Sequence, residues 1–116
     1  MTMQPGPELD KVVCEIVGIP VLHEYKRDAN GIMRYNDHYP HVSTSFTVHI
    51  EKILEWMKNT KMFWCLQNAN VFNEPEGWAC QYEDAEGNAK TSEQAQTIQH
   101  AVCLAVVEID KARKKA

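Results

Sequence analysis

Three histidines and several carboxylates share one segment of the chain and could bind a metal ion or move protons. His23, His38 and His41 are interspersed there with acidic residues, namely Glu24, Asp28 and Asp37. Imidazole and carboxylate together suit several divalent cations. However, His38 and His41 have a loop spacing and not the i, i+4 helical pair of zinc proteases. A solvated polar loop explains these residues better, so no metal ligand and no cofactor is predicted.

Candidate nucleophiles are also better explained by structure. Each of the cysteines lies in an apolar stretch, which is typical of small core residues in a cytosolic protein: Cys14, Cys65, Cys80 and Cys103. The hydroxyl cluster at 43–45 follows His41, but Ser and Thr in this position are good helix caps. No acid or oxyanion donor accompanies that cluster. No catalytic residue is therefore predicted.

Two aromatic side chains are candidates for contact with a partner protein. Trp56 lies off the apolar stripe of its expected helix, and Phe72 lies in a long connection over residues 67–77. An exposed tryptophan is a frequent binding hot spot. Trp64 and Trp78 instead have acidic neighbours where a nucleic-acid platform needs basic ones, so nucleic acid is not predicted to be a partner.

Composition places the chain among ordinary globular proteins. It has 116 residues, 44% hydrophobic and 24% charged residues, and a net charge of −4. This length fits a single domain over residues 1–116, with a loose lead-in over 1–6. The N-terminal stretch has neither the positive charge nor the apolar run of a signal peptide, and no segment has the apolar length to span a membrane. We therefore expect a cytoplasmic protein that does not bind membranes.

Three amphipathic segments are predicted to be helices. The first begins near Pro7, carries an apolar stripe at i, i+3 and i+4, and stops at Gly18. The second begins at Ser43 or Thr44 and ends near Asn59, with its apolar stripe at Phe46, Ile50, Ile53, Leu54 and Met57. The third opens with a capping box at Thr91 and runs to about residue 113. This last helix is apolar on most sides, so we expect it to be buried on most sides or to form a homodimer.

The remaining segments predict short antiparallel strands. Residues 62–66 are bulky and are predicted to be a strand buried on both faces, whereas 78–83 alternate as a half-buried strand does. Residues 88–90 could add a third strand. The segment 19–42 is irregular, and its Asn30-Gly31 pair indicates a short hairpin or an ordered loop. A two-residue turn there would set Arg27 opposite Arg34, which is repulsive.

This order of elements resembles the phage ABA sandwich domain family, which comprises small phage and prophage proteins. The similar stretches are Glu8–Val13 with Gly18, Val42–Ser45, Ile53–Met57, Gly77–Cys80 and Ala101–Val107. The resemblance implies an α+β fold in which three helices pack in layers on a small antiparallel β-sheet, as in an α/β/α sandwich. It carries no known activity.

The sequence therefore predicts a phage-type accessory protein that acts by binding a host or phage protein. A first alternative is a protein that sequesters a small ligand or nucleotide, with the 21–41 segment as the pocket wall. That wall would contain His23, Tyr25, Tyr35, His38 and His41. A second alternative is a metal-dependent hydrolase built on the same histidines. A preformed pocket would favour the first alternative, and a cluster of perturbed titratable groups would favour the second.

Overall fold

The chain folds into three helices and two small antiparallel sheets within the described residues, so the predicted α+β class is confirmed. The computed structural model describes residues 3–45, 49–68 and 77–114. The elements follow the order α1 (Pro7–Val17), β1 (Leu22–Arg27), β2 (Met33–His38), α2 (His49–Asn59), β3 (Phe63–Asn68), β4 (Trp78–Glu83), β5 (Ala89–Thr91) and α3 (Ile98–Lys114). None of the helices described is long and apolar enough to cross a membrane.

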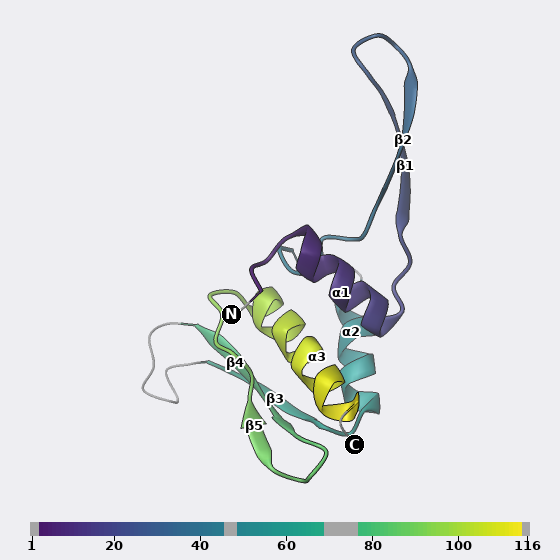
Figure 1. Cartoon of the computed structure of the whole chain (residues 1–116). Coiled ribbons are helices and arrows are strands. Elements are labelled where there is room, and N and C mark those ends of the chain that lie inside the picture. The colour runs from purple at the N-terminus through teal and green to yellow at the C-terminus, as the bar shows by residue number, and fades with distance from the viewer. Residues whose placement is uncertain (1–2, 46–48, 69–76, 115–116) are drawn as a thin grey trace.

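The three helices and the sheet of β3, β4 and β5 form the main part of the molecule, which we call the body. The helix α3 lies at its centre, between α1 and that sheet (Figure 1). Every residue from His100 to Val106 is buried, as is Ile109. The prediction that this helix is buried on most sides is confirmed. Since α1 and β4 of the same chain contact α3, its apolar surface is covered without a second subunit.

The helix ends show where local sequence signals succeed and fail. As predicted, α1 begins at Pro7 and ends at Gly18, which adopts a left-handed φ of 91° and donates its N–H to the carbonyl of Cys14. The predicted start of α3 at Thr91 is wrong, because Thr91 ends β5 and pairs with Gln81. The helix begins at Ile98 instead, where the Thr97 hydroxyl accepts a hydrogen bond from the His100 N–H.

The predicted cap of α2 is also wrong. Residues 42–45 form a turn, and within the described residues α2 begins at His49. The side chain of Ser43 instead contacts α1: its hydroxyl donates to Asp10 and accepts the N–H of Gly6, the N-cap residue of that helix. Of the predicted apolar stripe, Ile53 and Met57 are buried, Leu54 is exposed, and Phe46 lies outside the described residues.

The larger sheet has the order β3-β4-β5 and is antiparallel throughout. The register of β3 on β4 shifts between Phe63 and Cys65, which marks a bulge. Trp64 lies at this bulge and is 55% exposed, so the prediction that β3 is buried on both faces is wrong. A bulge interrupts the alternation of side chains, and this explains the exposure.

The strands β1 and β2 form a separate two-stranded ribbon, which we call the arm (residues 22–38). Figure 1 shows the arm extending away from the helices and from the larger sheet. The molecule accordingly measures 56 × 32 × 25 Å. Its radius of gyration of 16.2 Å exceeds the value of about 13 Å typical of a compact domain of this length. The predicted short hairpin is therefore present, as a projection from the body.

The arm turns through three residues instead of the two-residue Asn-Gly turn considered from the sequence. Asp28 and Gly31 close a turn by the Gly31 N–H bond to the Asp28 carbonyl, and Gly31 has a left-handed φ of 77°. This is a type I turn with a glycine bulge. The extra residue sets Arg27 opposite Met33 and Lys26 opposite Arg34.

Candidate functional site

The arm is the part of the described structure with the most exposed large hydrophobic side chains. Every residue of β1 and β2 is at least partly exposed. Tyr25 is 66% exposed, and four further large apolar or aromatic side chains of the arm are also exposed, namely Leu22, Ile32, Met33 and Tyr35. A two-stranded hairpin without a covered face is marginally stable by itself. The arm therefore has the features of a surface that contacts another molecule.

One face of the arm carries both tyrosines, and we call it the tyrosine face. Because side chains alternate along a strand, it comprises His23, Tyr25 and Arg27 of β1 with Met33, Tyr35 and Asp37 of β2. The rings of Tyr25 and Tyr35 meet edge to face, with centroids 4.8 Å apart. Nδ1 of His23 lies 2.7 Å from the Tyr35 hydroxyl and 2.8 Å from Oδ1 of Asp37.

The contact with His23 orients the Tyr35 hydroxyl. Desolvation raises the pKa of Tyr35, and the nearby charge of Asp37 raises it further. A neutral phenol can both donate and accept a hydrogen bond at physiological pH. The tyrosine face thus presents apolar rings with polar ends, which is the combination enriched at protein interfaces.

The structure brings two of the three predicted histidines together and separates the third. His38 and His41 stack with ring centroids 5.5 Å apart at the base of the arm, whereas His23 belongs to the tyrosine face. Nδ1 of His38 lies 3.1 Å from the Tyr39 carbonyl and Nε2 lies 3.2 Å from Glu24. Both contacts raise the pKa of His38, the carbonyl most strongly. Across residues 3–45, 49–68 and 77–114, no three His, Cys, Asp or Glu side chains are placed to hold a metal ion.

A buried acid accompanies the hydroxyl cluster near His41, but in an arrangement unsuited to nucleophilic catalysis. Ser43 donates its hydroxyl proton to Oδ1 of Asp10 at 2.6 Å, and its backbone N–H donates to the same oxygen. Nδ1 of His41 lies 3.7 Å from the other carboxylate oxygen. A nucleophilic serine must instead donate to the base and reach the substrate. Since Ser43 is fully buried, this cluster joins α1 to the 42–45 turn.

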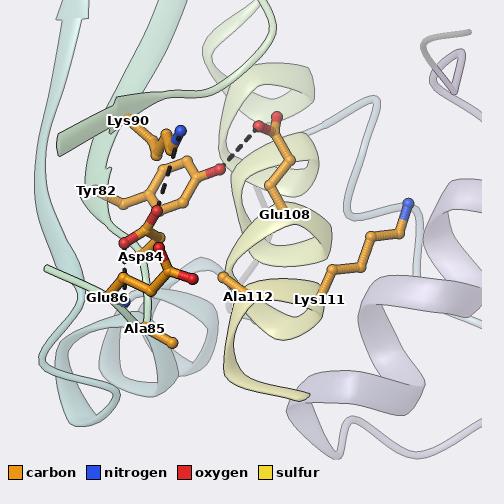
Figure 2. Close-up of a pocket in the computed structure, with 8 residues that line it drawn as sticks. All are labelled: Tyr82, Asp84, Ala85, Glu86, Lys90, Glu108, Lys111 and Ala112. Carbon is orange, nitrogen blue, oxygen red and sulfur yellow. Dashed lines mark hydrogen bonds and ion pairs between the residues drawn. The ribbon is translucent and has the colours of Figure 1, made fainter. Parts of the chain in front are cut away.

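A cleft of about 460 Å³ lies between the β4–β5 turn and α3 (Figure 2). Its lining comprises Tyr82, Asp84, Ala85, Glu86, Lys90, Glu108, Lys111 and Ala112. The Tyr82 hydroxyl donates to Oε1 of Glu108 at 3.2 Å, and the backbone N–H of Glu93 donates to Oε2 at 2.9 Å. Desolvation by burial raises the pKa of Glu108 and, together with the Glu108 charge, raises that of Tyr82 to about 12.

Four of the polar side chains that line the cleft are paired with one another. Tyr82 and Glu108 satisfy each other, and Figure 2 shows the Lys111 side chain directed away from that pair. Nζ of Lys90 lies 4.0 Å from Oδ2 of Asp84. None of the lining residues is a serine, cysteine or histidine. Residues 82 and 108 are far apart in the chain, and no sequence spacing indicated that they would meet.

The remaining predicted contacts lie elsewhere. Trp56 is half-buried against the core, and the guanidinium carbon of Arg113 lies 5.4 Å from its ring centroid. Trp64, which was expected to be buried, is the exposed tryptophan. Phe72 and most of the 67–77 connection lie outside the described residues. Of the arm's exposed apolar residues, Ile32 and Met33 were not among the candidates, although both immediately follow the Asn-Gly signal.

Comparison with protein-family models, with curated proteins and with solved structures finds no match for this chain.

Proposed function

We propose that the protein acts by binding another protein through the tyrosine face of the arm. The sequence resemblance to phage ABA sandwich proteins supports an accessory role of phage or prophage type, with a host or phage protein as the partner. The arm supplies the binding surface, and the α1, α2 and α3 body supplies a stable base for it. No catalytic step is part of this proposal.

The observation that carries the proposal is that the arm exposes its aromatic side chains and contributes none of its residues to the buried core. Tyrosine and arginine are enriched among hot-spot residues, and methionine is common at interfaces. Tyr25, Tyr35, Met33 and Arg27 together form such a set on one face. A partner that covers this face would also stabilise an otherwise marginal ribbon.

The two alternative functions have less support from the geometry. A sequestering pocket needs a concave wall, whereas both faces of the 22–38 ribbon are exposed. A metal-dependent hydrolase needs converging ligands, but His23 is on the opposite face of the arm from Glu24 and His38. Partner binding therefore explains the exposed tyrosines and histidines of the arm better than either alternative does.

The test is co-purification from a lysate of the organism that encodes the protein, with three tagged forms compared side by side. Tyr25→Ala/Tyr35→Ala should lose the partner that the wild type retains. Trp64→Ala is the matched control, because Trp64 is equally exposed but lies on the body. Retention of the partner by the double variant, or its loss in the control alone, would move the binding surface away from the arm.

A further inference from the structure

The outer edge of β1 has no strand beside it in the described structure. β1 pairs only with β2 within its sheet, and that sheet contains no other strand. An unpaired edge offers a row of N–H and C=O groups to another strand. We propose that two copies of the chain associate through this edge, so that two arms form one four-stranded antiparallel sheet with β1 beside β1.

The register within the arm determines which backbone groups face outward. The Asp28 N–H bonds to the Ile32 carbonyl at 2.9 Å, and these residues are opposite each other in the same register as Tyr25 and Tyr35. Hydrogen-bonded pairs alternate along an antiparallel ladder, so the even-numbered residues of β1 bond inward. His23, Tyr25 and Arg27 therefore direct their N–H and C=O groups outward. A two-fold pairing centred on Tyr25 uses all of these groups.

The charges along β1 are self-complementary in this register. With Tyr25 opposite its own copy, Glu24 lies opposite Lys26 of the second copy, and symmetry gives the same pair twice. Opposite charges directly across two strands are stabilising. Within its own arm, Lys26 is opposite Arg34, a like-charged residue. The second copy thus places a carboxylate directly opposite a lysine whose cross-strand neighbour within its own arm is the cation Arg34.

The same register extends the tyrosine face. Tyr25 of each copy would lie beside the other, and each is already paired with its own Tyr35 at 4.8 Å between ring centroids. The joined sheet would carry a row of tyrosines across all four strands. Arg27 of each copy would face His23 of the other, next to the carboxylate of Asp37, which lies 2.8 Å from that histidine. Aromatic and ionic pairs across strands both add to stability.

Pairing through the outer edge of β2 is less favourable. In the equivalent register, centred on Tyr35, Met33 would lie opposite Asp37 and Arg34 opposite Asn36. An apolar side chain opposite a carboxylate and a cation opposite an amide provide no ion pair. The charge pattern therefore selects the β1 edge and selects a second copy of this chain as its occupant. The interface is small, so the association should be weak and concentration-dependent.

The test is sedimentation equilibrium of the full chain over a wide range of protein concentration. The wild type should show a reversible monomer–dimer equilibrium. Lys26→Glu and Glu24→Lys should each weaken it about tenfold or more, because each change turns two attractive pairs into two repulsive pairs. The double variant Glu24→Lys/Lys26→Glu restores both attractive pairs and should recover the wild-type dissociation constant. Lys58→Glu and Glu55→Lys, at exposed positions of α2, are the matched controls and should dimerise normally.

If the single variants dimerised weakly because they folded poorly, the double variant would fold and dimerise even less well. Recovery of dimerisation in the double variant therefore excludes a folding defect as the cause. A wild type that stays monomeric, or a dimer that both single variants leave intact, would overturn the proposal. This inference concerns the edge of the arm, whereas the proposed partner binds its face. A variant that dimerises but no longer binds the partner, or one that binds the partner but no longer dimerises, therefore separates the two proposals.

Discussion

The hydroxyl of Ser43 and the carboxylate of Asp10 form a hydrogen bond of 2.6 Å in the interior of the body, and both side chains are almost completely buried. The residues are separated by the entire arm in sequence. Their bond, with the Ser43 N–H bond to the same oxygen, connects the chain entering the arm to the chain leaving it. This polar junction thus joins α1, which precedes the arm, to the 42–45 turn, which follows it.

This junction predicts a large effect of removing one hydroxyl. Ser43→Ala should lower the free energy of unfolding by about 1–3 kcal/mol, because a buried carboxylate loses a short hydrogen bond. Urea denaturation monitored by circular dichroism measures the change. Ser45→Ala serves as the control, since Ser45 is exposed and should change stability by less than about 0.5 kcal/mol. Equal effects of the two substitutions would show that the Asp10 contact is unimportant.

The partly buried carboxylate of Glu108 predicts a pH dependence of stability. Burial raises its pKa, so the folded protein holds this proton more tightly than the unfolded chain does. The resulting stabilisation is complete below the pKa of the unfolded carboxyl and is lost as the pH rises through the folded pKa. The stability of the wild type relative to Glu108→Gln should therefore fall as the pH rises above about 4.5, the ordinary pKa of this carboxyl.

Urea denaturation of both proteins at several pH values measures this difference. Glu86→Gln is the control, because Glu86 lines the same cleft but its side chain is exposed. A relative stability of the wild type that rises with pH would contradict the assigned direction of the shift.

Burial of three of the four cysteines predicts a simple pattern of thiol reactivity. Burial raises the pKa of Cys14 to about 11 and those of Cys80 and Cys103 to about 12, so all three stay protonated near neutral pH. The thiolate is the reactive form. At pH 8 about one thiol per folded protein molecule should react with Ellman's reagent, and we expect this thiol to be the half-buried Cys65. Cys65→Ser should remove it, and rapid reaction of a second thiol in that variant would show that the core opens.

The features that sequence alone predicted are those that local chemistry determines. Pro7 and Gly18 bound α1 because each suits one end of a helix. Thr91 was predicted to cap α3, but it pairs with Gln81 in the sheet, and the structure places Thr97 at the start of the helix instead. Nothing local indicates that Ser43 bonds Asp10 or that Tyr82 bonds Glu108, since these contacts depend on how distant elements pack. The predicted layered packing and the phage affiliation stay predictions.

The end of α2 offers a stabilising substitution. Lys61 adopts a left-handed φ of 60°, the one positive φ among the described residues other than glycine. This conformation destabilises the folded state by about 1–2 kcal/mol for a residue with a side chain. Glycine avoids this steric cost, but it loses more backbone entropy on folding, so the net gain from glycine is only part of that amount. Lys61→Gly should therefore raise the free energy of unfolding by about 0.5–1 kcal/mol in urea denaturation. Lys58→Gly, inside the last turn of α2, should lower it by about 1 kcal/mol. If both substitutions raised the free energy of unfolding, or both lowered it, the left-handed conformation of Lys61 would be refuted.

The separation of the arm from the core predicts that the arm can be removed without unfolding the body. Residues 22–38 can be replaced by a short glycine linker, because Leu22 and His38 are directly paired and their backbones are adjacent. The flanking core residues Ile19 and Val42 remain. Since no arm residue belongs to the buried core, the thermal midpoint should change by less than about 4 °C, the shift expected for 1 kcal/mol. Scanning calorimetry measures it, and loss of a cooperative transition would show that the arm helps to hold the body together.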